Sequence, residues 1–261
     1  MKTLLYFLIS SAFAQTTVHS DIVGGSVVSP TSPIAAQTVF VQAKLLNQTF
    51  SCTGTIISKH VVLTAAHCLG REYRADLTVS FQSPGHTKAT YAVIDRLAAI
   101  DELPIHAALN WHDLALIKLE KDIPADYSPI VLPTKELATD GAAVVLAGYG
   151  KTNPMPDDAT TGVGVLRSVD QTVLQAHYSE SELLVNIKSK GSCQGDSGGP
   201  AYMTINNQLV EVGVVSRLTD KDQVPSTNPR AGAAYACIED MIYTDVFAHM
   251  DWINASLQKL N

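Results

Sequence analysis

Three short stretches of the chain carry side chains that could together perform acyl transfer. They read LTAAHC, HDLALIKL and CQGDSGGP, and they supply His67, Asp113 and Ser197 in that order. A serine hydroxyl is a weak nucleophile. It needs a neutral imidazole to accept its proton and a carboxylate to orient that imidazole. The three stretches therefore predict a nucleophile, a general base and an orienting acid.

Two backbone amides next to the predicted nucleophile could stabilise the negative charge that develops during such a reaction. Glycines on both sides of Ser197 allow backbone conformations that other residues avoid. Amides aimed at a developing oxyanion are a main source of rate enhancement in acyl transfer. We therefore expect the amides of Gly195 and Ser197 to form an oxyanion hole.

The same stretch also fits the Gly-x-Ser-x-Gly pattern of an α/β-hydrolase, from Gly195 to Gly199. That fold needs its acid and then its histidine after the serine, on a parallel sheet with intervening helices. Only His249 follows Ser197 in the sequence, and the rest of the chain reads as short strands. The pattern therefore favours a site in which the histidine and the acid precede the serine.

The segments that must position these residues have the pattern of an all-β protein. Between about residues 38 and 220, short apolar and β-branched runs alternate with Gly, Pro, Asn and Asp, as in a sandwich or barrel. One such run is 163–166. The pair Asn206-Asn207 lies between two others and predicts a tight hairpin.

Two further segments indicate how the chain is organised. Residues 121–141 are weakly periodic and contain prolines, which predicts a linker between two β halves. Residues 245–258 have apolar side chains at helical spacing, which predicts a closing amphipathic helix.

The start of the sequence resembles a secretory leader. Residues 1–14 carry one Lys, an apolar stretch and a small-x-small end, so we expect a signal peptide there and a short propeptide at 15–21. No later apolar run is long enough to cross a bilayer. We expect a secreted protein, extracellular or periplasmic, without membrane association.

Charge and cysteine content exclude two other classes of protein. With 18 basic and 25 acidic side chains the net charge is −7, which argues against a nucleic-acid partner. Four cysteines in a secreted chain predict two disulfides, with three possible pairings. There is no Cys-x-x-Cys pair, so we expect no zinc or other metal.

Four motifs in a fixed order carry a family resemblance. They are IVGG from Ile22, TAAHC ending at Cys68, DLAL from Asp113 and GDSGGP from Gly195. Over residues 22 to about 256 the chain resembles the chymotrypsin-family (trypsin-like) serine endopeptidases. The resemblance makes 22–261 a peptidase domain.

The resemblance implies both a fold and a set of residue roles. The fold would be two packed six-stranded antiparallel β-barrels with the site between them and a C-terminal helix. His67 would act as general base and acid, Asp113 would orient it and Ser197 would be the nucleophile. The implied disulfides are Cys52 with Cys68 and Cys193 with Cys237.

Activation is also implied by the resemblance. A new ammonium group at Ile22 would pair with the buried carboxylate of Asp196 and hold the oxyanion loop in shape. The residue before the cut is Asp21, and residues 15–21 contain no Lys or Arg. The usual cleavage after a basic residue therefore cannot operate at this junction.

By the same resemblance, Gly191 lies at the base of the specificity pocket. Trypsin-like cleavage needs an Asp there to pair the buried cation of the substrate, so cleavage after Lys or Arg is not expected. Ser216 would pair with the substrate backbone, while Leu218 and Met241 would narrow the pocket. We therefore expect a preference for small or medium apolar side chains.

The leading hypothesis is a secreted serine endopeptidase that acts through an acyl-enzyme. It needs no cofactor, acts on protein or peptide substrates, meets protein inhibitors and is a monomer. The alternative is a catalytically silent pseudoprotease or binding protein on the same scaffold. The long insertion between Ser216 and Cys237 is expected to be a solvated loop.

Overall fold

The computed structural model describes residues 22–70, 74–100, 109–155, 161–219, 223–224 and 234–260. The expected signal peptide and propeptide lie outside these residues, as does most of the insertion before Cys237. Within that insertion, β13 (Gln223–Val224) pairs with β14 (Ala234–Tyr235).

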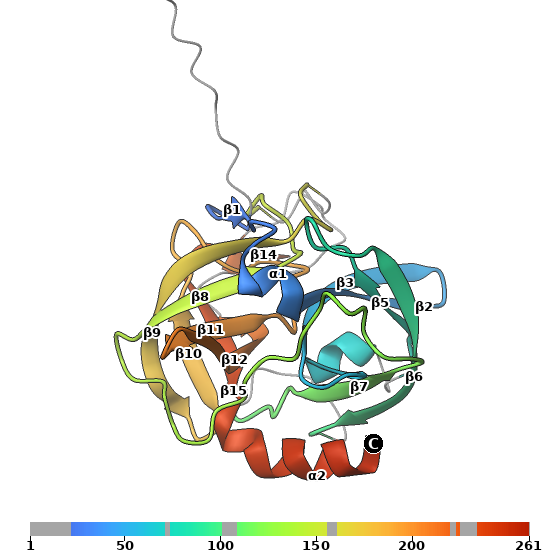
Figure 1. Ribbon diagram of the computed structural model, residues 1–261. Coiled ribbons are helices and arrows are strands. Elements are labelled where there is room, and N and C mark those ends of the chain that lie inside the picture. The colour runs from blue at the N-terminus through green and yellow to red at the C-terminus, as the bar shows by residue number, and fades with distance from the viewer. Residues whose placement is uncertain are drawn as a thin grey trace, which may run out of the picture.

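Two antiparallel β-barrels lie side by side (Figure 1). The first barrel closes in the order β2-β3-β4-β7-β6-β5. Its strands are β2 (Thr38–Leu45), β3 (Gln48–Ile56), β4 (Val61–Thr64), β5 (Asp76–Phe81), β6 (Ala89–Ala98) and β7 (Ala115–Leu119). Two short helical segments belong to this half: α1 (Pro33–Gln37) and the 3₁₀ turn η1 (Ala66–Leu69).

The second barrel is built from the strands that follow. They are β8 (Ala143–Gly148), β9 (Arg167–Ser179), β10 (Glu182–Asn186), β11 (Pro200–Ile205), β12 (Gln208–Leu218) and β15 (Asp240–Asp245). The sheet order is β1-β9-β10-β15-β12-β11-β8, and because β8 also pairs with β9, six strands form a closed ring. The short strand β1 (Ser26–Val27) adds to the edge of β9. The predicted fold of two six-stranded barrels is therefore confirmed.

Each barrel encloses its own apolar core. Leu63 and Leu116 are fully buried in the first core, and Leu146 and Leu183 in the second. Burying such a side chain contributes about 1.5–3 kcal/mol. Burial of apolar side chains along these strands therefore stabilises the two units that support the site.

The structure confirms one local prediction and corrects another. Asn206 and Asn207 both have positive φ, 48° and 63°, and they join β11 to β12 as a tight hairpin. The expected strand at 163–166 is wrong, because β9 begins only at Arg167. Gly162 and Gly164 adopt φ of 86° and 89°, which turns the chain before the strand starts.

The two barrels are joined along the chain and by a helix. Residues 120–142 contain no named strand, although Val131 forms an isolated parallel bridge with Val210. The helix α2 (Met250–Leu260) follows β15 and the 3₁₀ turn η4 (Phe247–His249). It begins at Met250 rather than near 245, because Asp245 still belongs to β15. Figure 1 shows α2 running along the bottom of the molecule, and Ile253 is buried in the first core.

Candidate active site

The two barrels contribute different parts of the predicted triad. His67 lies in η1, which follows β4, and Asp113 lies two residues before the start of β7. Because β4 pairs with β7, with Thr64 opposite Ala115, the two side chains emerge at neighbouring strand ends. Ser197 comes from the second barrel, just before β11.

The carboxylate of Asp113 holds His67 through two hydrogen bonds. Its Oδ2 lies 2.7 Å from His67 Nδ1, and its Oδ1 accepts the His67 backbone amide at 2.9 Å. The Ser216 hydroxyl also donates to Oδ2, at 2.8 Å. Asp113 is fully buried, whereas the His67 side chain is 28% exposed. The imidazole is thus fixed on its Nδ1 side, and its other nitrogen is left for chemistry.

The pKa values of this pair are shifted in opposite directions. Burial alone would lower the pKa of His67, but the charge and hydrogen bond of Asp113 outweigh it and leave the pKa above 6.5. Burial alone would raise the pKa of Asp113, but His67 and Ser216 leave it below 3.8. Asp113 therefore remains a carboxylate at neutral pH.

Ser197 is placed on a tightly anchored loop. Its carbonyl oxygen accepts the Thr53 amide at 2.8 Å, and the next amide, that of Gly198, donates to Val215 O at 2.9 Å. Ser197 and His67 line the same cavity of about 480 Å³. The structure thus brings the predicted nucleophile to the cavity that contains the predicted base.

The two predicted oxyanion donors have no acceptor within the part of the chain that the structure describes. Neither the Gly195 nor the Ser197 amide donates to another described residue, although the amides of Asp196 and Gly198 do. Gly195 has a φ of 96°, and a Cβ there would lie 2.9 Å from the Cα of Gly150. Only glycine fits this backbone without strain. Two donors are thus available beside the nucleophile.

Asp196 is completely buried behind the oxyanion loop. Its carboxylate accepts the Gly150 amide at 2.7 Å and the Cys193 amide at 2.8 Å. Burial nevertheless raises its pKa to about 7. Ile22 is also fully buried, and the next residue, Val23, forms an isolated bridge with Gly191. The start of the described chain therefore lies inside the second barrel.

A second cavity, of about 170 Å³, is also lined by Ser197. Ser216, Leu218 and Met241, which the resemblance assigns to the specificity pocket, are among its lining residues. Gly191 is not among the lining residues. A Cβ on it would lie 2.5 Å from Ile187, so this glycine permits close packing behind the cavity.

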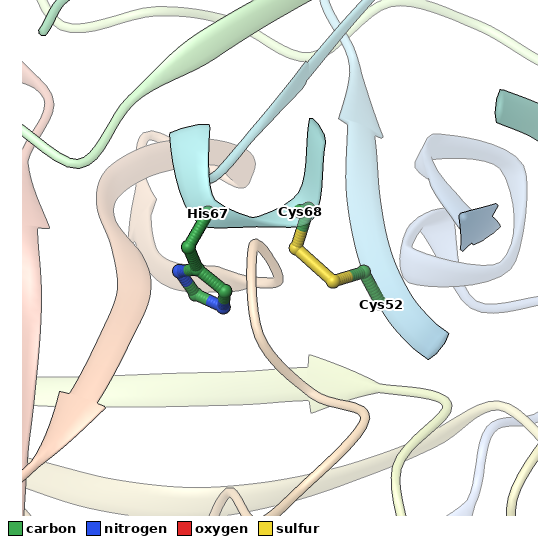
Figure 2. A group of neighbouring side chains, drawn as sticks. All are labelled: Cys52, His67 and Cys68. Atoms are coloured by element: carbon green, nitrogen blue, oxygen red, sulfur yellow. A yellow bond between two sulfur atoms is a disulfide. The ribbon is translucent and has the colours of Figure 1, made fainter. Parts of the chain in front are cut away.

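Both disulfides support the site, and their pairings are those implied by the resemblance: Cys52–Cys68 and Cys193–Cys237. Figure 2 shows the first beside His67, joining η1 to β3. The three side chains are close enough to suggest metal ligands. However, disulfide sulfurs are not thiolates and make poor ligands, so this group does not fit a metal.

Some residues at the site could not be identified from the sequence alone. Glu182 is a buried acid that contacts Arg217 and the backbone of Trp111, and its only signal was an acid at the start of an apolar strand. His249 is buried, and its Nε2 lies 3.0 Å from Nδ1 of His112. Neither contact is visible in a linear motif.

Comparisons with known proteins agree with this architecture. A family model described as Trypsin matches residues 22–253. Kallikrein 1-related peptidase b21 of Mus musculus is 26% identical over 99% of both chains. Snake venom serine protease KN2 of Trimeresurus stejnegeri is 28% identical over 79% of this chain and 77% of its own length. Hypodermin-A of Hypoderma lineatum is 32% identical over 63% of this chain and 66% of its own.

Solved structures show the same fold. HL collagenase aligns with a TM-score of 0.69 and 21% identity, covering 90% of this chain and 97% of that one. The structure of GrC aligns with a TM-score of 0.65 and 22% identity, covering 90% and 99%. Among the described residues no helix is long and apolar enough to cross a membrane. With the family model matching nearly all of the chain from Ile22 onward, the chain belongs to the trypsin family of serine endopeptidases.

Proposed function

We propose that this chain is a secreted, catalytically active endopeptidase that hydrolyses peptide bonds through an acyl-enzyme on Ser197. The observation that carries the proposal is the hydrogen-bonded pair of His67 and Asp113 facing a cavity that Ser197 shares. Inactive relatives of an enzyme typically lose part of such a set, and here each member is present.

The proposed reaction uses His67, Ser197 and the two backbone amides. Ser197 Oγ attacks the carbonyl carbon of the substrate while His67 Nε2 takes the hydroxyl proton. The oxygen of the tetrahedral intermediate receives the Gly195 and Ser197 amides. Collapse breaks the C–N bond, and the leaving amine takes the proton from His67. Water then attacks the acyl-enzyme with His67 as base, which releases the carboxylic acid and restores Ser197.

The substrate preference follows from the smaller cavity. Met241 and Leu218 line it, and no acid is among its lining residues in the described part of the chain. A buried substrate cation would lack a partner there, at a substantial energetic cost. The enzyme therefore prefers small or medium apolar side chains before the scissile bond and rejects Lys and Arg.

Activation by a cut before Ile22 is part of the proposal. Ile22 is a β-branched residue with a φ of 48°, a conformation that such residues avoid. Cleaving the Asp21–Ile22 bond would remove that torsional constraint and create an ammonium group, which we expect to pair with the buried Asp196. The freed charge would offset the burial of that carboxylate.

The proposal is tested by labelling with a fluorophosphonate probe. Processed protein that begins at Ile22 should be labelled on Ser197, and Ser197→Ala should reduce turnover on the order of 10⁶-fold. Ser128→Ala, at an exposed serine away from the cavity, should behave as wild type. Failure of processed, folded wild-type protein to react would favour the pseudoprotease alternative.

A further inference from the structure

A buried ion pair lies next to the substrate-facing strand. Arg217, in β12, donates from Nη1 to Glu182 Oε1 at 2.6 Å. Its guanidinium carbon lies 4.6 Å from the centre of the Trp111 ring. The side chains of Arg217 and Glu182 are only 12% and 1% exposed. The pair is therefore part of the interior rather than of the surface.

Both oxygens of the Glu182 carboxylate accept hydrogen bonds. Besides Arg217, Glu182 Oε1 accepts the Trp111 backbone amide at 3.2 Å, and Oε2 accepts the Ser179 hydroxyl at 2.9 Å. Burial would raise the pKa of Glu182, but the hydrogen bond and charge of Arg217 outweigh it and leave the pKa below 4.5. Glu182 therefore remains ionised at neutral pH.

Trp111 and Arg217, which bond to Glu182, are close in sequence to residues of the active site. Trp111 lies two residues before Asp113, and Arg217 directly follows Ser216, whose hydroxyl donates to Asp113. Arg217 also lines the 170 Å³ cavity. One carboxylate from β10 is thus bonded both to the segment that carries the triad acid and to the strand that lines the specificity cavity.

The segment before Asp113 needs such support. Asn110 and His112 have φ of 60° and 48°; asparagine tolerates the left-handed region, whereas it is costly for His112. Strained backbone persists only where its surroundings fix it. Within the described residues, the Trp111 amide between them is fixed by Glu182, and the Asn110 side chain accepts the Ser181 hydroxyl at 3.2 Å.

We propose that Glu182 is a positioning residue, whose carboxylate sets the segment carrying Asp113 and the cavity wall at Arg217 in one arrangement. This inference rests on the proposed function of the same site. Buried ion pairs add little net stability, because desolvation offsets their attraction. The effect of this pair should therefore appear in the geometry of the triad rather than only in folding.

The test compares three processed enzymes with wild type: Glu182→Gln, the double variant Glu182→Gln with Arg217→Met, and the control Glu180→Gln. Glu180 is an exposed acid on the same turn, so its variant also removes one negative charge. Loosening of the triad should reduce kcat/KM of Glu182→Gln on the order of 10²-fold, with a lower kcat and a higher KM. The double variant should not recover this loss, because it also lacks the carboxylate that accepts the Trp111 amide. Recovery would show that the loss comes only from the unmatched charge of Arg217 and would overturn the inference. Glu180→Gln should match wild type.

A second measurement does not depend on turnover. In a Ser197→Ala background, the His67 pKa followed by NMR should fall in Glu182→Gln and stay unchanged in Glu180→Gln, because Asp113 is no longer held against the imidazole. An unchanged His67 titration in a folded Glu182→Gln variant would overturn the inference, as would a loss of activity that only tracks the fraction folded. Absence of activity in wild type would count against the proposed function instead, and the titration would still decide the role of Glu182.

Discussion

The hydroxyl of Ser216 donates to the same Asp113 oxygen that lies against His67 Nδ1, at 2.8 Å. Asp113 is fully buried, and a hydrogen bond to a charged group contributes about 1.5–3 kcal/mol. We expect Ser216→Ala to raise the pKa of Asp113 and to lower kcat about tenfold, which corresponds to about 1.4 kcal/mol. Steady-state kinetics measure this, and Ser216→Thr, which keeps a hydroxyl, serves as the matched control. Equal kcat in the Ala variant and wild type would contradict the expected role.

Activity should rise with pH through the pKa of His67, because only the neutral imidazole can accept the serine proton. Asp113 raises that pKa, so the acid limb of kcat/KM should lie above pH 6.5 in wild type. Asp113→Asn removes the opposing charge and leaves burial dominant, so the limb should move below 6.5 and kcat should fall about 10⁴-fold. Rate profiles from pH 5 to 9 measure both effects. An acid limb that stays in place in the variant would show that another group controls it.

Glu211 should make the folded state less stable as the pH rises. It is fully buried between the barrels, with Oε1 accepting the Thr55 hydroxyl at 3.0 Å and Oε2 lacking a partner among the described residues. Burial raises its pKa from 4.5 to about 8. The unfolded chain therefore loses this proton at lower pH than the folded chain, and the free energy of unfolding should fall between about pH 4.5 and 8.

Glu211→Gln tests this prediction, since it removes the titrating group and keeps the side-chain shape. Relative to wild type, the variant should gain stability between pH 5 and pH 8 in urea unfolding experiments. Glu180→Gln, at an exposed position, should show no such trend. If the free energies of unfolding of wild type and Glu211→Gln changed in parallel across this pH range, Glu211 would not be the group responsible.

Processing should stabilise the protein most at neutral pH. In the uncut chain, burial raises the pKa of Asp196 from 3.8 to about 7 despite the charge of Arg167, so the free energy of unfolding falls as the pH rises through this range. A free ammonium at Ile22 should lower this pKa. In a Ser197→Ala background, the cut chain should therefore exceed the uncut chain in melting temperature by more at pH 7.5 than at pH 5. Acetylating the Ile22 amine removes its charge and should abolish that difference.

Met241 should limit the side chains that the enzyme accepts. Met241→Ala should enlarge the 170 Å³ cavity and raise the ratio of kcat/KM for a Phe peptide to that for a Val peptide about tenfold or more. Because Met241 is buried, the variant should also lose roughly 2–5 kcal/mol of stability. Met155→Ala, at a half-exposed methionine, is the control. An unchanged ratio of kcat/KM values in folded Met241→Ala would show that other residues determine the specificity.

The sequence predicts best where a short motif and its chemistry coincide. The strand that leads into TAAHC and the strand that begins within DLAL pair regularly, so His67 and Asp113 lie at neighbouring strand ends. The hairpin at Asn206 is equally local, because asparagine tolerates left-handed backbone. By contrast, the expected strand at 163–166 failed because counting apolar residues ignores two glycines that turn the chain.

Roles that depend on distant partners could not be predicted. Glu182 bonds to Trp111 and Arg217, which lie 71 and 35 positions away along the chain. No spacing in the sequence links them, because the contact exists only once the barrels have packed. His249 is similar, since its burial depends on the turn between β15 and α2.

The amides of Gly195 and Ser197 also bear on how this protein could be engineered. These two amides lie close together in sequence and have no acceptor in the described structure. Their unsatisfied hydrogen bonds cost stability, which the rest of the fold must offset. Selection for thermal resistance alone would reward any rearranged turn that satisfied them. Such variants would be more thermostable but catalytically inactive. A library screened for heat tolerance should therefore be screened for turnover in the same round.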